Sequence, residues 1–455
     1  MKKVKFRKKH KQILIYTGIA ILIIFFLYIL IMPRIKKGDA SYGQVHNISQ
    51  DSIEFLYDLT YEKDGKVVHD TQIYDKFLEI INNSRKFILF DMFLFGSDDR
   101  PAFRNISDEV TNALLQKKKE NPDIIIYFIT DEMSVIYSIY NGSHFDLLSK
   151  NGINVIYTSK NKPYLERKTY PVQNSLKYMK SNLNHRKLIV ADNDSKIVSL
   201  VTSANTHDPS SDYSNVAFYV TDKIWKDIYE TEKQTAEIND PELDYFFETF
   251  NEPLSEDVKD VSIQTLNDAA MIDSLIIEID KTTLGDSIDI ANFYLFNLKV
   301  KAALIKASKR GVNISLILDK NLNLFGEKQF GYPNQPVAQD LIKESNGQIS
   351  VRWYKTRKEQ FHSKMVVIRT KKGVIVFLGS SNLSEKRVFG YNLETDIKII
   401  ADSSSKIIKD IDAYFARISE NIDGEYTQSY EEGKDTSVFQ RIRYEFESFM
   451  KSISL

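Results

Sequence analysis

The sequence has 455 residues, of which 42% are hydrophobic and 27% are charged, which is typical of a folded chain long enough for two domains and excludes a disordered one. Cysteine is absent, which excludes disulfides, a thiol nucleophile and cysteine-bound zinc or iron–sulfur clusters. The seven histidines lack metal-ligand spacing, so we expect neither a metal ion nor another cofactor.

The N-terminal region predicts a membrane anchor. Residues 13–32 contain no charged side chain and are long enough to cross a bilayer core of about 30 Å as a helix. Seven Lys and Arg precede this stretch and three follow it, so the positive-inside rule places residues 1–12 in the cytoplasm. We expect an uncleaved single-pass helix in the cell membrane rather than a signal peptide, because the apolar stretch exceeds the usual signal-peptide core. Residues 33–51 then form a polar stalk to an extracytoplasmic region.

Two stretches of the chain alternate strands with helices. In the first we expect a helix over 72–82, a strand over 87–95 that carries Asp91, a helix over 107–119 capped by Ser107, and a strand over 124–129 that ends at Asp131. In the second we expect a helix over 267–280, a strand over 287–296 with Asn292 as the counterpart of Asp91, a helix over 299–310, and a strand over 313–318 that ends at Asp319. This alternation predicts an α/β fold with parallel strands and helices on both faces.

The charge distribution marks two further segments. Beyond residue 37 the chain has 51 basic and 62 acidic residues, a net charge of −11. Residues 159–187 depart from this trend with eight Lys and Arg and one Glu, and we expect them to form a rim that attracts an anionic substrate. The acidic stretch 231–260 has two prolines and is expected to connect the two parts of the chain. Helices over 406–420 and 437–453 end the chain, and the last of them has no predicted function.

A set of polar residues occurs twice at a constant offset of 177 residues. His185 and Lys187 recur as His362 and Lys364. The residues that follow them recur at the same offset: Ser203, Asn205 and Asn215 in the first copy, Ser380, Asn382 and Asn392 in the second. We therefore expect a first unit over residues 52–235, a linker over 236–260 and a second unit over 261–455.

These residue types suit chemistry at a phosphodiester. Two histidines can divide the roles of nucleophile and proton donor, because imidazole changes protonation near neutral pH. The lysines supply positive charge, while Ser and Asn supply neutral donors for phosphate oxygens. One copy of the set would be half a site, whereas two copies in one chain make a complete one. A monomeric catalytic unit is therefore sufficient.

The pattern HxKxxxxD, followed by GSxN and then NxE, resembles the duplicated signature of the phospholipase D superfamily. The resemblance implies two similar α/β/α sandwich units related by a pseudo-twofold axis, with no metal in the mechanism. It also implies roles for particular residues. The catalytic set comprises His185, His362, Lys187, Lys364, Asn205, Asn382 and Glu394. The substrate-binding set comprises Ser203, Ser380, Asn215 and Asn392.

Three positions depart from the family pattern: Arg369 stands in place of Asp, Thr202 in place of Gly, and Ala217 in place of an acidic residue. With Glu394 intact in the second copy, we expect this carboxylate to bond His362 and favour its imidazolium form. His362 would then be the general acid and His185, lacking such a partner, the neutral nucleophile. Two alternatives stay open: the roles are exchanged, or Asp208 or Asp212 serves His185.

The expected function is that of a membrane-anchored phosphodiesterase or phosphatidyltransferase. It would act on anionic phospholipid headgroups through a phosphohistidine, as phospholipase D and bacterial cardiolipin synthase-like proteins do. The alternative is a metal-independent nuclease, which the basic segment favours and the net charge of the exported part disfavours. A third reading is a phosphate or lipid binder that has lost turnover with Ala217.

Overall fold

The computed structural model describes residues 40–98, 100–132, 134, 143–158, 183–250, 258–324, 327–328, 330–384, 392–434 and 437–454. The predicted anchor over residues 13–32 and most of the basic segment, residues 159–182, lie outside the described residues. Within the described ranges, no helix is both long enough and apolar enough to span a bilayer.

The first part of the chain forms a seven-stranded sheet. Its strand order is β3 (Ile53–Asp58), β12 (Asn215–Val220), β11 (Lys196–Thr202), β10 (Lys187–Asn193), β6 (Phe87–Met92), β7 (Ile125–Thr130) and β8 (Asn154–Tyr157). The second part forms a ten-stranded sheet in the order β1 (Ser41–Tyr42), β13 (Val261–Asn267), β24 (Thr395–Ala401), β21 (Gly373–Gly379), β20 (Lys364–Thr370), β14 (Ser287–Asn292), β16 (Asn313–Leu318), β19 (Ile349–Tyr354) and β25 (Thr427–Ser429), with β2 (His46–Ile48) on β13. The seven strands from β3 to β8 occur in the same order as those from β13 to β19.

The expectation of parallel pairing is correct for only part of each sheet. Strands β6, β7 and β8 are parallel, as are β14, β16 and β19. The motif strands β10 and β20 run antiparallel to β6 and β14. Each motif strand also forms a hairpin with the strand after it, and the first turn holds Asp194 at φ 53°. Such short turns can join only antiparallel strands, so the fold is mixed α/β.

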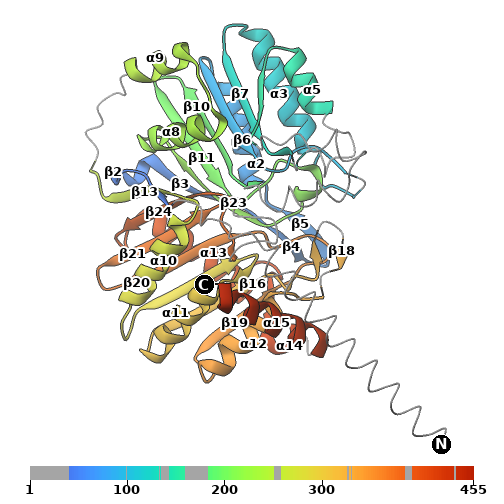
Figure 1. The fold of residues 1–455 in the computed structure, drawn as a ribbon, viewed down its shortest axis with the longest axis vertical. Coiled ribbons are helices and arrows are strands. Elements are labelled where there is room, and N and C mark those ends of the chain that lie inside the picture. The colour runs from blue at the N-terminus through green and yellow to red at the C-terminus, as the bar shows by residue number, and fades with distance from the viewer. Residues whose placement is uncertain are drawn as a thin grey trace, which may run out of the picture.

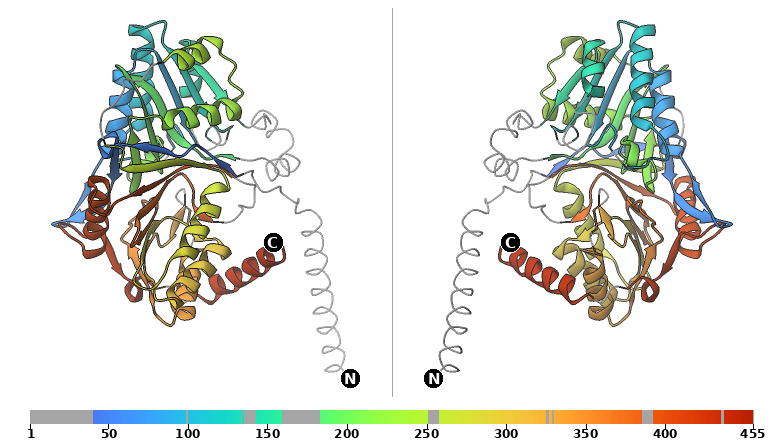
Figure 2. Two further views of the ribbon diagram at one scale, coloured as in Figure 1. Left: turned by 90° about the vertical axis from the view of Figure 1, so that its left-hand side faces the viewer. Right: turned by 90° about the vertical axis from the view of Figure 1, so that its right-hand side faces the viewer.

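Helices cover the outer face of each sheet (Figure 1). On the first sheet these are α2 (Gln72–Asn83), α3 (Ile106–Glu120) and α5 (Ser143–Lys150), and on the second α10 (Ala270–Lys281), α11 (Leu298–Lys309) and α12 (Asn334–Glu344). The inner faces share one buried core with α8 (Ile224–Ala236), α9 (Pro241–Thr249) and α13 (Lys406–Glu420). The two halves are therefore stacked, with the inner faces of their sheets between them, as the side views of Figure 2 show.

The remaining elements are short, apart from the last helix. They are the hairpin β4 (Thr60–Lys63) and β5 (Lys66–His69), the paired strands β9 (Leu183–Asn184) and β23 (Asn392–Leu393), β15 (Leu295–Phe296) and β22 (Leu383–Ser384), β17 (Asn323–Leu324) and β18 (Glu327–Lys328), the 3-10 turns η1 (Gln50–Ser52) and η2 (Asp208–Ser210), and the helices α14 (Tyr430–Gly433) and α15 (Val438–Ser454).

Two of the expected segments differ from the structure. Part of the predicted stalk is structured, since β1 and β2 both pair with β13 and so extend the second sheet. The predicted linker contains α9, which Asp240 caps by accepting hydrogen bonds from the N–H groups of Glu242 and Leu243. The expected cap of α3 is also wrong, because that helix begins at Ile106 after Asn105.

Candidate active site

Reciprocal backbone contacts bring the two motif regions together at the junction of the halves. The residues before His185 pair with the residues before Glu394, because β9 runs parallel to β23 and the His185 N–H donates to the Leu393 carbonyl at 2.9 Å. The residues before His362 pair in turn with those before Asn215, where the Ser214 N–H donates to the Gln360 carbonyl at 3.1 Å. Each histidine therefore lies beside a polar residue of the other half.

A buried aspartate at a strand end holds the segment before each histidine. The Asp131 carboxylate accepts the N–H of Asn184 at 3.0 Å, and the Asp319 carboxylate accepts the N–H of Phe361 at 2.7 Å. Burial raises the pKa of Asp319 to about 7. These are the two aspartates that the sequence places at the ends of the parallel strands, and their function is to fix the backbone from which the histidines project.

The two histidines have different partners. The Nδ1 atom of His185 lies 2.9 Å from Oε2 of Glu394, whereas Nδ1 of His362 lies 3.1 Å from Oδ1 of Asn215. The expectation that Glu394 bonds His362 is wrong, because the exchange of backbone contacts between the halves places Glu394 beside His185. Both rings are buried, with exposed fractions of 3% and 6%.

Each motif lysine lies beside its own histidine. The Lys364 Nζ atom is 2.9 Å from both the carbonyl oxygen and Nε2 of His362, and Lys187 donates to the His185 carbonyl. Burial, followed by the charges of Lys364, Lys187 and His185, lowers the pKa of His362 well below its usual value. Side chains of the first copy are therefore close enough to act on the histidine of the second.

An aromatic ring supports each histidine. The Phe93 ring centroid is 4.7 Å from that of His185, and the Phe293 centroid is 5.2 Å from that of His362. The same rings lie 5.1 Å and 5.7 Å from the nearest lysine Nζ, so each also forms a cation–π contact. Each of these phenylalanines directly follows a central strand, β6 or β14.

The sheet register corrects the alignment of the two copies. Ser203 N–H donates to the Val216 carbonyl, and Ser380 N–H donates to the Thr395 carbonyl. The residue before Val216 is Asn215 and the residue before Thr395 is Glu394, so these two are equivalent, and Ala217 is equivalent to Asp396. The missing carboxylate is thus at position 215 rather than 217. A constant sequence offset could not show this, because the second copy has two more residues between Asn382 and Glu394.

The departures at Thr202 and Ala217 compensate for each other. Thr202 faces Ala217 across β11 and β12, and Gly379 faces Asp396 across β21 and β24. A Cβ atom on Gly379 would lie 2.5 Å from the Cα of Asp396, so a larger residue does not fit opposite Asp396. In each copy the larger side chain of the facing pair is therefore on one strand only: on β11 in the first copy, as Thr202, and on β24 in the second, as Asp396. The Thr202 hydroxyl accepts the N–H of Ala204 at 3.0 Å, just as the Asp396 carboxylate accepts the N–H of Ser381 at 3.1 Å.

We predict that these two sites couple in a double-mutant cycle. Thr202→Gly alone removes a buried hydrogen bond and should lower the free energy of unfolding by about 1–2 kcal/mol. Ala217→Asp alone buries a carboxyl against Thr202 and should cost about 2–4 kcal/mol. The double variant reproduces the pair in the second copy, so we expect it to recover at least about 1 kcal/mol in denaturant unfolding. Additive losses would contradict the compensation.

The asparagines that follow β11 and β21 have buried side-chain oxygens without a hydrogen-bond partner among the described residues. Among the described residues, Oδ1 of Asn205 and Oδ1 of Asn382 have no hydrogen-bond partner, although both side chains are almost fully buried. Because amide oxygen and nitrogen are interchangeable by a flip, either group can present N–H donors at the same place. Because the same feature occurs at two equivalent positions, these amides are candidates for binding a polar ligand.

The predicted serines and Asn392 act on neighbouring side chains. The Ser203 hydroxyl donates to Oδ1 of Asn215 at 3.0 Å, and the Asn392 amide donates to Oε1 of Glu394 at 3.0 Å. The Ser380 hydroxyl accepts the N–H of Thr395 at 3.0 Å. In the structure Ser203 and Asn392 therefore hold the side chains that face the histidines, and Ser380 holds the main chain next to Glu394.

Several other expected residues lie away from the histidines. Asp192 accepts three backbone N–H groups at the start of β6, while its counterpart Arg369 pairs with Asp289 and Asp412, so this position supports the fold in both copies. Asp208, which was considered as a partner for His185, accepts from Ser107.

The sheet register also revises the counterpart of Asp91. Asp91 faces Leu188 and Asn292 faces Lys364, so the position equivalent to Asp91 is Ala291. The expected pairing of Asp91 with Asn292 was therefore displaced by one residue.

Comparison with known proteins agrees with this arrangement. The family model described as "Cardiolipin synthase, PLD-like domain" matches residues 275–419. The crystal structure of phosphatidylserine synthase from Haemophilus influenzae Rd KW20 superimposes with a TM-score of 0.60 at 12% identity, covering 90% of this chain and 95% of that one. Polyphosphate kinase from Porphyromonas gingivalis gives a TM-score of 0.48 at 12% identity over 81% of this chain and 47% of that one. None of the curated proteins matches.

The fold is similar to that of the phosphatidylserine synthase structure, and it brings two histidine–lysine motifs of one chain together. The resemblance seen in the motifs is confirmed by the family model of a cardiolipin synthase, PLD-like domain. The second half of the chain is the part that matches the cardiolipin synthase-type domain.

Proposed function

We propose that this protein is a phosphatidyltransferase-type enzyme that acts on phospholipid headgroups through a phosphohistidine. The observation that carries the proposal is the meeting of both histidine–lysine pairs at the junction of the halves, each histidine bonded to a residue of the other half. The match to a cardiolipin synthase-type domain supports a lipid substrate. We further propose that the two units are related by a pseudo-twofold axis that passes between the histidines.

His185 is the nucleophile in this proposal, for a reason different from the one the sequence suggests. Attack by Nε2 of His185 forms the P–N bond, breaks the P–O bond to the headgroup alcohol and leaves a cationic phosphoimidazole. The Glu394 carboxylate, 2.9 Å from Nδ1, fixes the ring tautomer and offsets this charge. The opposite assignment would place the cationic ring beside Lys364 with only an amide at Nδ1.

His362 is then the proton donor and, in the second step, the base. In the free protein its lowered pKa keeps it neutral at pH 7. An anionic phosphate bound beside Lys187 and Lys364 offsets their charges and lets His362 take up a proton for the leaving alkoxide. Neutral again, it accepts a proton from the incoming alcohol or water, which attacks phosphorus and releases His185. The amides of Asn205 and Asn382 donate to phosphate oxygens throughout.

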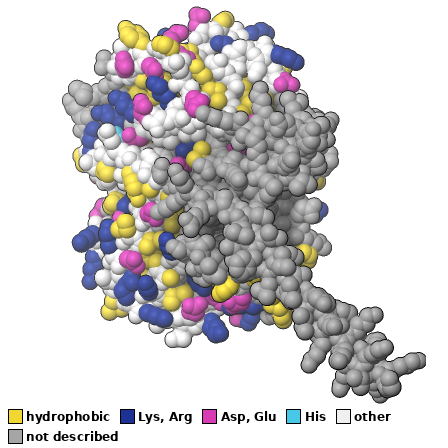
Figure 3. All heavy atoms as spheres, in the orientation of Figure 1, with side chains coloured by type: hydrophobic (Ala, Val, Ile, Leu, Met, Phe, Trp, Pro, Cys, Tyr) yellow, Lys and Arg dark blue, Asp and Glu magenta, His cyan; other side chains and the backbone are white. Residues whose placement is uncertain are grey.

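The predicted anchor over residues 13–32 would hold this site next to the outer surface of the cell membrane. A lipid substrate fits this location better than a long polyanion does. Over the described part of the face in Figure 3, Lys and Arg side chains are interspersed with Asp and Glu, unlike the broad basic surface that binds nucleic acid.

One assay tests the proposal. The purified full-length protein is incubated, without added metal, with vesicles of phosphatidylglycerol and phosphatidylethanolamine and, in parallel, with single-stranded DNA. We expect release of headgroup or formation of cardiolipin, measured by mass spectrometry, and no reaction with His185→Ala. Cleavage of DNA alone would replace this proposal with a nuclease, and vesicle binding without turnover would replace it with a noncatalytic lipid binder.

A further inference from the structure

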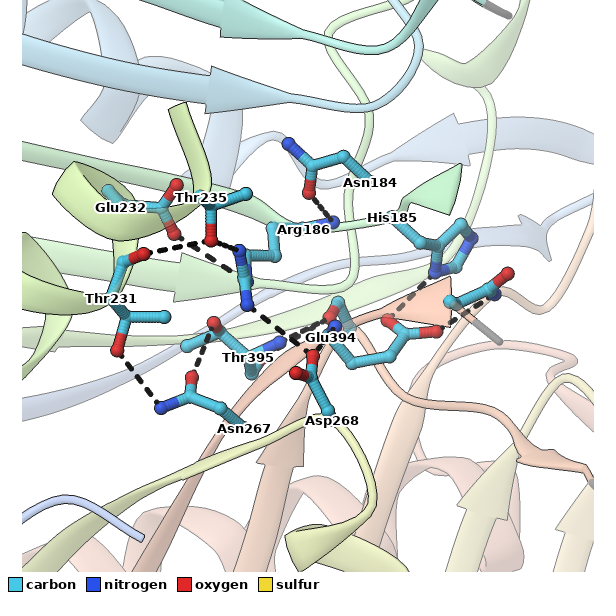
Figure 4. Close-up of polar contacts among 12 residues, drawn as sticks. Asn184, His185, Arg186, Thr231, Glu232, Thr235, Asn267, Asp268, Glu394 and Thr395 are labelled. Carbon is cyan, nitrogen blue, oxygen red and sulfur yellow. Dashed lines mark hydrogen bonds and ion pairs between the residues drawn. The ribbon is translucent and has the colours of Figure 1, made fainter. Parts of the chain in front are cut away.

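A buried charged cluster joins the two halves directly behind His185. Figure 4 shows three of its members: Arg186 of the first motif, Asp268 just after β13, and Glu232 of helix α8. The fourth member is Asp91 of strand β6. Arg186 is 2% exposed and Glu232 and Asp91 are fully buried. The sequence places Arg186 in the basic segment over 159–187, expected to form a rim that attracts an anionic substrate, whereas in the structure this side chain is buried.

Asp268 binds the backbone of Glu394 in both directions. Its carboxylate accepts the Glu394 N–H at 3.0 Å, and its own N–H donates to the Glu394 carbonyl at 3.1 Å. Its backbone has φ 57°, a left-handed conformation that Asp tolerates better than most residues. Asp268 thereby fixes the main chain from which the Glu394 side chain reaches His185.

Arg186 holds Asp268 from the side of the first half. Its guanidinium donates to the Thr235 hydroxyl at 2.6 Å and to the same Asp268 oxygen at 3.4 Å, with Nε 3.6 Å from the Glu232 carboxylate. Helix α8 thus supplies two of its partners, Thr235 and Glu232. Arg186 directly follows His185 in sequence. The same short segment therefore carries the histidine and the arginine that, through Asp268, helps to position Glu394 beside that histidine.

Two buried carboxyl groups, Glu232 and Asp91, lie behind Arg186. Burial, reinforced by the nearby Asp91 charge, raises the pKa of Glu232 well above its usual value, and burial raises that of Asp91 as well. The raised pKa favours the neutral form of Glu232, while Asp91 accepts from the Asn184 amide at 2.8 Å and 3.0 Å. Neutralising one carboxyl lowers the repulsion between the two and leaves negative charge near Arg186.

The other histidine has no such cluster at the equivalent positions. Ser363 replaces Arg186 and contacts the Tyr414 hydroxyl at 3.2 Å, and Ala291 replaces Asp91. The charged cluster therefore accompanies the carboxylate-bonded histidine and is replaced by neutral groups where the partner is the amide of Asn215. Because the second half folds in the same way without these charges, the fold itself does not require them, which favours a positioning function for the cluster.

We propose that Arg186 and Asp268 are positioning residues that hold the Glu394 carboxylate against His185, with Glu232 and Asp91 keeping Arg186 in place. The inference rests on the proposed function, because it assigns the cluster to the nucleophilic half of that mechanism. If this is so, His185 is correctly oriented only when the two halves of the protein are packed against each other.

The test compares Asp268→Ala, Asp268→Asn and Glu278→Ala. Glu278 is a matched control, since its buried carboxylate binds Lys398 on β24 at 2.7 Å without contacting the Glu394 backbone. We expect Asp268→Ala to lower kcat for phosphatidyl transfer about 10–100-fold with KM within about twofold, as loss of an orienting partner does elsewhere. Asp268→Asn, which keeps an acceptor for the Glu394 N–H, should restore most of the rate, and Glu278→Ala should lower only the Tm.

A second readout needs no substrate. In histidine-labelled protein, the ¹⁵N resonances and titration of His185, assigned by their loss in His185→Asn, should change in Asp268→Ala and not in Glu278→Ala. An unchanged His185 spectrum in Asp268→Ala, or equal effects of Asp268→Ala and Glu278→Ala, would overturn the positioning function. Since the spectrum is independent of lipid turnover, an inactive protein with the expected spectral change would reject the proposed function and keep this inference.

Discussion

Phospholipid labelled in its phosphate is expected to leave the label on the peptide that contains His185. His185→Ala should form no adduct and lose transfer by at least about 10⁴-fold, because no other group replaces the attacking nitrogen. The measurement is peptide mapping by mass spectrometry after the reaction is stopped at alkaline pH. The physical reason is the Glu394 carboxylate, which stabilises the cationic adduct on this ring only.

His362→Ala provides the control for this trapping experiment. With a substrate whose leaving group needs no protonation, such as a nitrophenyl phosphodiester, this variant should still form the adduct and should accumulate it, because the base for the second step is missing. Label on the peptide of His362 in the unmodified protein would exchange the roles of the two histidines.

Glu394→Gln is expected to lower kcat by about 10²–10⁴-fold with little change in KM. The amide keeps the size of the side chain, yet it neither fixes one tautomer of His185 nor offsets the charge of the adduct. After this change both histidines would have an amide partner at Nδ1, as His362 has in Asn215. Steady-state kinetics on vesicles measures the effect, and a rate within threefold of the unmodified protein would show that the carboxylate is not needed.

Asn215→Asp is the reciprocal change and tests the second histidine through pH. Burial and the neighbouring lysines lower the pKa of His362, so in the free protein its protonated form is lost as pH rises through that lowered value. An added carboxylate at Nδ1 raises this pKa. We therefore expect the alkaline limb of kcat/KM to move to higher pH, by about one unit or more. A limb that stays in place would mean that His362 is not the proton donor.

Strong periodic segments could be predicted from the sequence. The helix over 72–82 and the strand over 313–318 match α2 and β16 to within a residue, because apolar spacing and buried strands leave clear patterns. Strands such as β3 and β12 were not predicted, since their pairing with each other depends on contacts more than 150 residues apart in sequence. The motif strands β10 and β20 are antiparallel to the strands that follow them because short turns connect each pair. The alternation of strands and helices in the sequence gives no information about these turns.

The repeated motif predicted which residues meet, but not how they pair. Two histidines and two lysines at one offset indicated a shared site, and the structure places both sets at the junction. The partner of each histidine comes from the other half, so sequence proximity favoured the wrong pairing of Glu394 with His362. Arg186 was assigned to the basic rim because a charged residue beside a motif is usually solvated, and only burial distinguishes the exception. Asp268 was missed because it lies far from both motifs in sequence, and only the fold brings it to Glu394.

The first strands that the structure describes, β1 and β2, affect how the two halves are connected. Strands β1 and β2 complete the edge of the second sheet before the chain enters the first, and the linker after α9 returns it to β13, their pairing partner. Proteolytic cleavage between α9 and β13 would give two fragments. The N-terminal fragment would remain bound to the C-terminal one through the pairing of β1 and β2 with β13. To express the second half as a separate protein, one would therefore have to include β1 and β2, because these N-terminal strands pair with β13 of the second sheet.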